Sequence, residues 1–220
     1  MSQTAKLLTE FVGTFVFLSV IALSGPIGPL APLAIGSALM VMVYMGGHVS
    51  GGHYNPAVSL GVFLRRELGL GLLIAYWFAQ LAGSVAAFGF GYLVSNHTPG
   101  IHPGSGVTLP SALAIETVFT MVLVLVVLNV AATKAIQGNS FYGLAIGFAI
   151  VIAAFAGGGI SGGAFNPAIG FGATLGGVLF AGGSWQYLWI YIVGPAAGAV
   201  IAAVIHAIQI KGLESAAKSH

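Results

Sequence analysis

The sequence SGGHYNPAVSLG at residues 50–61 returns in closely similar form as SGGAFNPAIGFG at residues 161–172. Both stretches contain Ser-Gly-Gly-x-x-Asn-Pro-Ala, and 111 positions separate their asparagines, Asn55 and Asn166. When residues 33–63 are aligned with residues 144–174 at this offset, 14 of the 31 pairs are identical. This similarity indicates an internal duplication in which each half of the chain carries one copy of the motif.

The composition indicates a membrane protein. Of the 220 residues, 58% are hydrophobic and 5% are charged, whereas about 25% of the residues in an average soluble domain are charged. Six apolar runs approach the roughly 20 residues that cross a bilayer as a helix. We therefore predict an all-α membrane protein with six transmembrane helices, the first of them a retained span and not a signal peptide. The runs lie at 5–23, 31–49, 70–94, 110–130, 140–157 and 185–209.

Two further apolar runs, 55–64 and 166–178, are too short to cross and begin at the Asn-Pro-Ala motifs. Each half of the chain then holds three spans and one short helix, with the first repeat at about 1–95 and the second at about 110–210. Because three is odd, the second repeat enters the membrane from the opposite face. We expect a single domain over residues 1–220, in which two re-entrant half-helices meet at a central pore.

The basic residues predict the orientation, since Lys and Arg accumulate on the cytoplasmic side of membrane proteins. All six fall in the two tails or in the joints after the second and fourth spans, which lie on one side. We expect both termini to be cytoplasmic and the protein to lie in the plasma (inner) membrane. These residues are Lys6, Arg65, Arg66, Lys134, Lys211 and Lys218.

The Asn-Pro pairs predict how the half-helices begin. Asn is a favoured N-cap and Pro a favoured first helical residue. The asparagine carbonyl then caps the helix, and the NH2 group is free to donate into the pore. Gly-rich backbone at membrane depth must be buried or line a wet cavity. We expect the pore midplane to consist of Asn55, Pro56, Ala57, Asn166, Pro167 and Ala168.

With these motifs the chain resembles the aquaporin, or major intrinsic protein, family over its whole length. The segment HVSGGHYNP at residues 48–56 is most similar to the water-channel branch. The resemblance implies a passive channel, assembled as a homotetramer, in which the half-helix ends repel cations as in aquaporin-type pores. It also implies that Glu10 and Glu116, together with His48 and His53, brace the re-entrant loops.

The sequence departs from the family at the outer selectivity filter. Where the family usually has an arginine after the second Asn-Pro-Ala, this chain has Ile169. The family's spacing places the other filter positions at Ile35, Ala154 and Gly163. This set is apolar and uncharged. We expect a wide filter that admits solutes beyond water, such as glycerol, urea, ammonia, hydrogen peroxide or metalloid acids.

The sequence also allows three functions other than a passive channel. Inverted repeats with broken helices also build coupled secondary transporters, and a closed apolar ring would give a non-conducting membrane protein. The sequence Gly159-Ile-Ser161-Gly162 and His206 match a rhomboid-type intramembrane serine protease. Ser161 has a repeat twin at Ser50, however, so we expect no enzymatic activity. The net charge of +2 is too weak to indicate a nucleic-acid partner, and without cysteine there is no thiolate metal site. We expect no metal and no cofactor, and we expect the lipid bilayer, water and small neutral solutes as partners.

Overall fold

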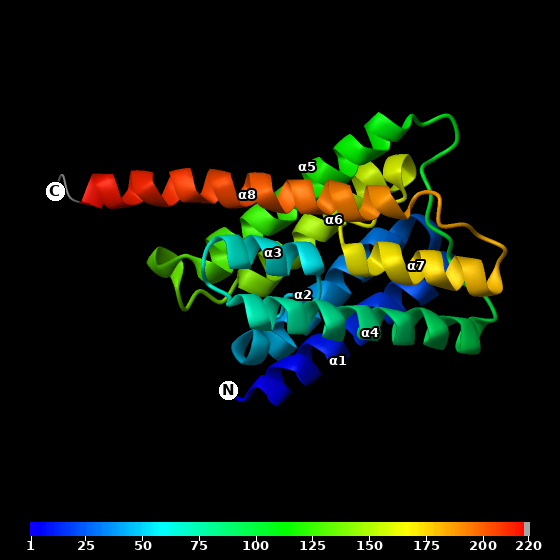
Figure 1. The fold of residues 1–220 in the computed structure, drawn as a ribbon, viewed down its shortest axis with the longest axis horizontal. Helices are drawn as coiled ribbons and strands as arrows, with labels where there is room; N and C mark the ends of the chain where they lie inside the picture. The colour runs from blue at the N-terminus through cyan, green and yellow to red at the C-terminus, as the bar shows by residue number, and fades with distance from the viewer. Residues whose placement is uncertain (218–220) are drawn as a thin grey trace.

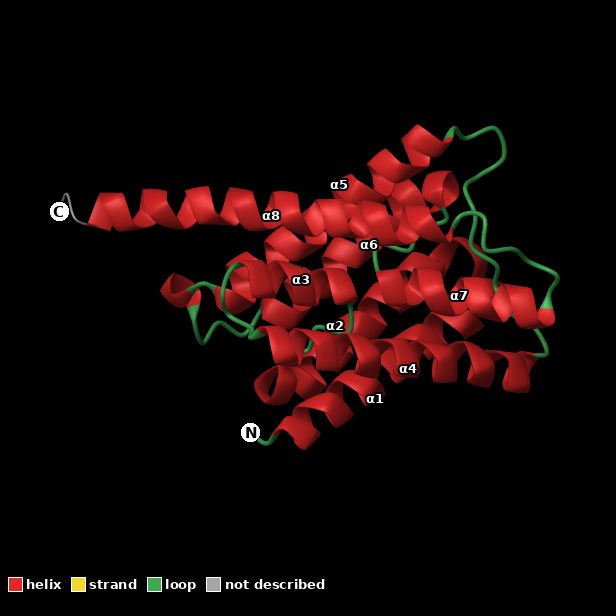
Figure 2. Ribbon diagram, in the orientation of Figure 1, coloured by secondary structure: helices red, strands yellow, loops and turns green. Residues whose placement is uncertain are grey.

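A computed structural model describes residues 1–217, and these form helices joined by loops (Figures 1 and 2). Within the described residues, six helices are long and apolar enough to cross a membrane, so the predicted fold class is confirmed. Lys218, counted above among the basic residues, lies outside this range. The main helices are α1 (Gln3–Leu23), α2 (Ala31–Ser50), α3 (Pro56–Leu64), α4 (Leu70–Ser95), α5 (Leu109–Val127), α6 (Tyr142–Ser161), α7 (Pro167–Phe180) and α8 (Leu188–Ala217). Short helical turns, η1 (Gly25–Leu30), η2 (Leu128–Ala132) and η3 (Lys134–Ile136), join some of them.

Local chemistry sets several helix boundaries. The side chains of Ser2 and Thr108 cap α1 and α5, which satisfies a backbone N–H group that has no partner within the helix. At their other ends, α2 and α6 stop at Gly51 and Gly162, whose φ angles are 97° and 98°. Left-handed backbone of this kind favours glycine and turns the chain into the re-entrant loop. The two copies of Ser-Gly-Gly therefore end their helices in the same way.

The helices pack as an inverted pair of repeats. Helix α1 packs on α4, its counterpart α5 packs on α8, and α2 packs on α6 across the repeat boundary. The α2–α6 crossing is close, because a Cβ atom added at Gly147 would lie 2.6 Å from the Gly36 carbonyl oxygen. Small residues allow such an approach in membrane bundles. In Figure 1 the half-helices α3 and α7 extend from opposite ends of the molecule and meet between α4 and α8.

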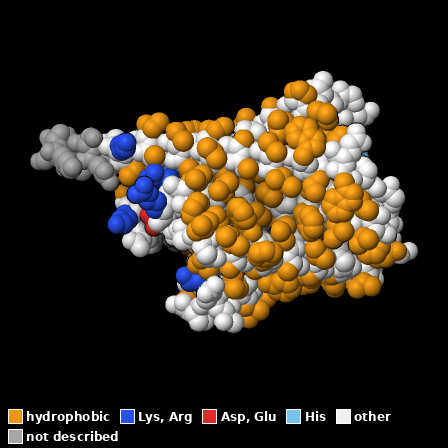
Figure 3. Space-filling view, in the orientation of Figure 1, with side chains coloured by type: hydrophobic (Ala, Val, Ile, Leu, Met, Phe, Trp, Pro, Cys, Tyr) orange, Lys and Arg blue, Asp and Glu red, His pale blue; other side chains and the backbone are white. Residues whose placement is uncertain are grey.

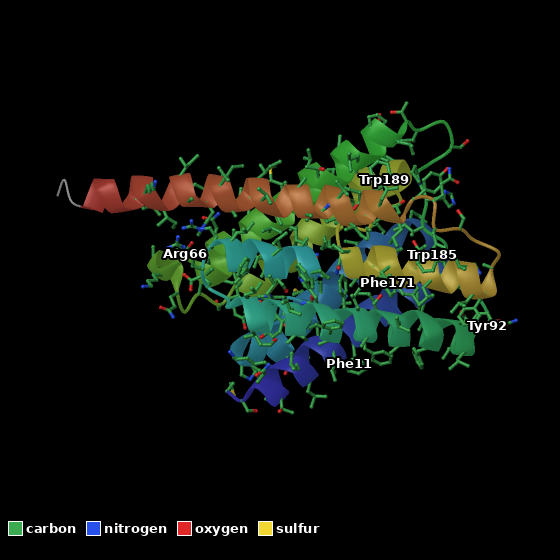
Figure 4. All side chains as sticks on the ribbon, in the orientation of Figure 1. Phe11, Arg66, Tyr92, Phe171, Trp185 and Trp189 are labelled. Carbon is green, nitrogen blue, oxygen red and sulfur yellow. The ribbon has the colours of Figure 1, made fainter. Side chains whose placement is uncertain are left out.

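The surface matches a multi-pass membrane protein. Hydrophobic side chains cover the broad middle of the molecule, whereas Lys and Arg gather at the end where the two chain termini lie (Figure 3). Arg66 lies at that end, and Trp185, Trp189 and Tyr92 lie toward the opposite one (Figure 4). Tryptophan and tyrosine prefer the membrane–water interface. The distribution places the apolar belt in the bilayer, with the basic end on one side of it.

Candidate functional site

The two re-entrant loops share an unusual backbone. After the left-handed glycines, Tyr54 and Phe165 also adopt positive φ angles, 48° and 51°. Such angles are rare for bulky side chains and persist only where the surroundings hold them. Both side chains are fully buried, and hydrogen bonds from their backbone N–H groups hold the turns. The partners of those groups are the two intramembrane glutamates.

Glu10, on α1, holds the first loop. Its Oε1 accepts hydrogen bonds from the Ser50 hydroxyl at 2.7 Å and from the His53 backbone N–H at 3.0 Å. Its Oε2 accepts from the Tyr54 N–H and from the Gln80 side chain, both at 2.8 Å. Four donors compensate for the burial of this carboxylate, which would be very costly without partners. Its geometry suits a structural brace between α1, the loop and α4.

Glu116, on α5, does the same for the second loop. Its Oε1 accepts from the Ser161 hydroxyl at 2.7 Å and from the Ala164 N–H at 3.0 Å. Its Oε2 accepts from the Phe165 N–H at 2.6 Å. Among the described residues no equivalent of the Gln80 bond is present at Glu116, so the two braces differ by one donor. The serines of the two Ser-Gly-Gly motifs belong to these networks, which the sequence alone did not indicate.

The two asparagines cap the half-helices as expected. The Asn55 carbonyl oxygen accepts from the Ala57 N–H at 2.8 Å, and that of Asn166 accepts from the Ala168 N–H at 2.9 Å. Their NH2 groups, however, are not entirely free. Asn55 Nδ2 donates to the Phe165 carbonyl at 2.9 Å, and Asn166 Nδ2 donates to the Tyr54 carbonyl at 3.0 Å. One hydrogen of each NH2 group therefore joins the loops, and one remains for the pore.

The two histidines expected to brace the loops have different surroundings. His53 is buried, and its Nδ1 lies 3.0 Å from the Ser59 hydroxyl, which also accepts from Gln80 at 3.0 Å. His48 is exposed at the end of α2, and no hydrogen bond joins it to the loop within the described part of the chain. Its exposure and the lack of a hydrogen bond to the loop among the described residues give no support to the bracing role of His48, which stays a prediction.

Three cavities lie in series along the bundle. A cavity of about 560 Å³ opens at the basic end, among Lys6, Glu67 and Lys134. A small cell of about 10 Å³ lies at the centre and is lined by both asparagines. A third cavity, of about 270 Å³, lies toward the other end. His53 and Val127 line both the first cavity and the central cell, and Ile150 and Ile169 line both the cell and the third cavity.

The structure brings the four expected filter residues together. Ile35, Ala154, Gly163 and Ile169 all line the third cavity, toward the end away from the lysines. The loop between α4 and α5 also reaches this cavity through Pro99, Gly100 and Ile101. The family spacing did not identify these loop residues, because a connecting loop has no repeat twin to align with. The cavity lining is almost wholly apolar in its side chains.

Several residues around the central cell were also missed from the sequence. Their side chains are aliphatic or aromatic and come from four long helices, α1, α2, α5 and α6, so no local motif marks them. Only the tertiary structure brings them to the asparagines. These residues are Phe17, Leu39, Leu123, Val127, Ile146 and Ile150.

Ser161 and His206, the two residues of the protease hypothesis, form hydrogen bonds with different partners. The Ser161 hydroxyl donates to Glu116. His206 accepts at Nδ1 from Arg65 Nε at 3.0 Å, and its Nε2 lies 2.9 Å from the Thr133 hydroxyl. A serine nucleophile needs its base within hydrogen-bond reach. Each residue is engaged by other partners, and within the described part of the chain no hydrogen bond joins Ser161 to His206.

Comparison with known protein families gives a match over most of the chain. The model of the major intrinsic protein family matches residues 1–206. Aquaporin TIP1-2 of Zea mays is 36% identical over 225 residues, covering 93% of this chain and 85% of the relative. Glycerol uptake facilitator protein-like 6 of Lactiplantibacillus plantarum is 34% identical, covering 90% of this chain and 94% of the relative. Aquaporin-8 of Rattus norvegicus is 38% identical, covering 84% and 74%.

A solved structure agrees with these sequence relatives. The aquaglyceroporin from Plasmodium falciparum superposes with a TM-score of 0.82 at 25% sequence identity. The match covers 93% of this chain and 96% of the solved chain. The similarity therefore extends over the full arrangement of spans and half-helices.

Proposed function

This chain belongs to the major intrinsic protein family, and on that premise we propose the path and the residues by which it conducts water and small neutral solutes. It is a passive channel of the kind that its aquaporin and glycerol-facilitator relatives represent. The observation that carries the path is the series of three cavities that passes between Asn55 and Asn166. Solutes enter at the basic end, pass the asparagines and leave through the apolar outer cavity, or travel in reverse.

At the midplane, hydrogen-bond donors orient the solute. Each asparagine has one amide hydrogen left after its cross-loop bond, and each half-helix presents its N-terminal end to the path. A passing water or hydroxyl group therefore turns its oxygen toward the asparagines. The positive ends of α3 and α7 disfavour cations there. Pro56, Ala57, Pro167 and Ala168 fix the first turns that carry these ends.

The outer cavity supports a neutral-solute filter. Ile35, Ala154, Gly163 and Ile169 give it no charged side chain, so a solute is not required to satisfy a fixed cation there. We propose that glycerol, urea, ammonia, hydrogen peroxide or undissociated metalloid acids can reach the midplane from this side. Without an arginine, the half-helix ends supply the electrostatic barrier to protons and cations.

Coupled transport is the alternative, and the glutamates argue against it. Coupling uses intramembrane acids that bind and release ions. Glu10 and Glu116 accept four and three hydrogen bonds respectively from loop and helix donors. A change of protonation would break the loops that they hold. We assign them bracing roles and no transport cycle.

Some features of the assembly follow from the family resemblance. We propose a homotetramer in which each protomer, as a single domain over residues 1–220, carries its own pore. The basic end, with both termini, faces the cytoplasm, and the protein lies in the plasma (inner) membrane. Neither a cofactor nor a catalytic residue is part of this function.

Stopped-flow light scattering on reconstituted vesicles tests the proposal. After exposure to a urea or glycerol gradient, vesicle shrinkage reports water flux and re-swelling reports solute flux. We expect shrinkage well above that of protein-free vesicles, unaffected by collapse of proton and sodium gradients. Flux equal to that of empty vesicles, from protein shown to be folded, would favour the non-conducting reading. Dependence of solute flux on either ion gradient would favour the transporter.

A further inference from the structure

We propose that the central cell, with Val58 as its decisive side chain, is the size filter of this pore, and that the outer quartet is not. This inference rests on the proposed function and deepens it, because it specifies which neutral solutes pass. The central cell is lined by the two asparagines, by His53, and by a collar of apolar side chains. Val58 and Ile169 occupy equivalent places in that collar, each directly after an Asn-Pro-Ala motif.

The dimensions of the cavities carry the proposal. The central cell offers about 10 Å³ to the centre of a water-sized sphere, and the outer cavity offers about 270 Å³ on the same measure. Roughly 10–15 Å³ is needed to hold one water molecule. The cell therefore accepts one water, whereas the outer cavity accepts a solute of several heavy atoms. A solute must therefore lose most of its surrounding water molecules at the midplane and not in the outer cavity.

The missing arginine explains why the narrow point lies at the centre. A long cationic side chain after the second motif would extend into the outer cavity. Ile169 is short, is only 4% exposed, and lies between the central cell and the outer cavity. Ile169 and Val58 therefore both narrow the central cell, while no long side chain after the second motif fills the outer cavity.

The collar is not readily widened by side-chain movement. Val58 is 2% exposed, and Leu39, Leu123 and Ile146 are also buried in the packed core. Core side chains of this kind sit in fixed rotamers at near-crystalline density. A valine also has a restricted χ1 angle, because its Cβ carries two methyl groups. The cell size is therefore a fixed property of the folded protein.

The solutes favoured by such a cell are small and accept hydrogen bonds. The polar side chains that line the cell are the two asparagines, whose amide groups donate, and His53. The apolar collar offers a solute no compensation for its lost water. Water fits both the volume and the donors. Urea and glycerol fit the outer cavity but exceed the cell, so they should cross more slowly than water. Selection by size then occurs after the solute has passed the outer filter.

The test truncates two aliphatic side chains, each of which lines only one of the two cavities. Val58 lines the central cell and not the outer cavity, whereas Ile35 lines the outer cavity and not the cell. In reconstituted vesicles, Val58→Ala should raise urea flux relative to water flux by about tenfold, the lower end of what a methylene-sized change does to discrimination in a pocket. Ile35→Ala, in the wide outer cavity, should change this ratio much less than Val58→Ala does. Val41→Ala, at a valine 51% exposed on α2, is the matched control.

The outcomes separate the filter from the channel. If Ile35→Ala raises the urea-to-water ratio and Val58→Ala does not, the outer quartet is the size filter and the inference is overturned. Rapid urea entry through the wild-type protein would also overturn it, while leaving the channel function intact. Absence of water flux in the wild type would instead refute the proposed function. Should Val58→Ala fail to fold, Val58→Ile provides the converse test, since a larger collar side chain should slow water itself.

Discussion

Asn55 and Asn166 each donate a hydrogen bond to the loop that carries the other asparagine. Asn55 Nδ2 lies 2.9 Å from the Phe165 carbonyl oxygen, and Asn166 Nδ2 lies 3.0 Å from that of Tyr54. Both acceptors, Phe165 and Tyr54, have a positive φ angle. The reciprocal pair therefore joins the two halves of the chain at two residues whose backbone conformation is rare for bulky side chains. It also fixes which amide hydrogen remains for the pore.

Asn166→Asp should destabilise the protein while keeping its helix cap. The aspartate oxygen can still accept from the Ala168 N–H, but it cannot donate to Tyr54, so a buried carbonyl loses its partner. Such a loss costs about 1–3 kcal/mol. Thermal unfolding in detergent should show a lower midpoint than that of the wild type. Asn96→Asp, at an exposed asparagine after α4, is the control, and equal midpoints for the two variants would refute the role of the cross-loop bond.

Glu10→Gln should destabilise the protein more than Glu116→Gln. In Glu116→Gln, the NH2 group that replaces Oε2 cannot accept a hydrogen bond, so the buried Phe165 N–H loses its acceptor. This loss costs about 1–3 kcal/mol. In Glu10→Gln, the same replacement leaves two donors without an acceptor, the Tyr54 N–H and the Gln80 NH2 group. The loss of stability should therefore be larger. Unfolding midpoints measure both, with Glu67→Gln at an exposed carboxylate as control. The reverse order would show that the Gln80 bond contributes little.

Gly147→Ala should weaken the packing of α2 on α6. The added Cβ would lie 2.6 Å from the Gly36 oxygen and 2.7 Å from the Met40 Cβ, so the helices must separate. Overpacking of this kind typically costs about 1–3 kcal/mol. Gly89→Ala is the matched control, since nothing lies within 4 Å of the added Cβ. It should be neutral or slightly stabilising because alanine is the better helix former, and comparable losses in both variants would contradict the crossing.

Ile169→Arg should lower urea flux more than water flux. The arginine would extend from the boundary of the central cell into the outer cavity and fill part of its 270 Å³ with a cation and its hydration. Water can pass beside a guanidinium, whereas a larger solute is obstructed. Stopped-flow traces of water and urea flux give both quantities, with Ile169→Leu as the uncharged control. Unchanged fluxes in the arginine variant would mean that residue 169 does not face the path.

Arg65 and His206 should show energetic coupling across the basic end of the bundle. Arg65 Nε donates to His206 Nδ1 at 3.0 Å, and this bond ties the end of α3 to α8. A double-mutant cycle with Arg65→Ala and His206→Ala should give a coupling energy of about 1 kcal/mol from unfolding free energies. Each single variant serves as the control for the other. Additive losses would show that the bond contributes nothing to stability.

Much of the fold could be predicted from the sequence because its causes are local. Hydropathy over roughly 20 residues identifies a span wherever it lies in the chain, and the structure places helices at all six predicted runs. Asn-Pro caps and begins a half-helix through atoms within three residues of each other, so α3 and α7 start at Pro56 and Pro167 as expected. The duplication then required the two half-helices to enter from opposite sides.

The site was only partly predictable. The repeat identified the two asparagines, because each has a twin in matched sequence, and the family resemblance indicated Glu10 and Glu116. His48 was expected to brace the first loop; it lies exposed in the last turn of α2, and its bracing role stays a prediction. Gln80 has no counterpart at Glu116 among the described residues, and no sequence pattern indicates its role.

What the sequence alone determined is therefore the membrane class, the inverted repeat and the identity of the midplane asparagines, all of which depend on local composition or on internal similarity. Only the tertiary structure decided the cross-loop bonds, the Arg65–His206 contact and the width of the path at each level. The bonded partners stand 110, 112 and 141 residues apart. The volume of a cavity depends on how side chains from several helices pack together, and the sequence pattern of a single segment does not determine that packing.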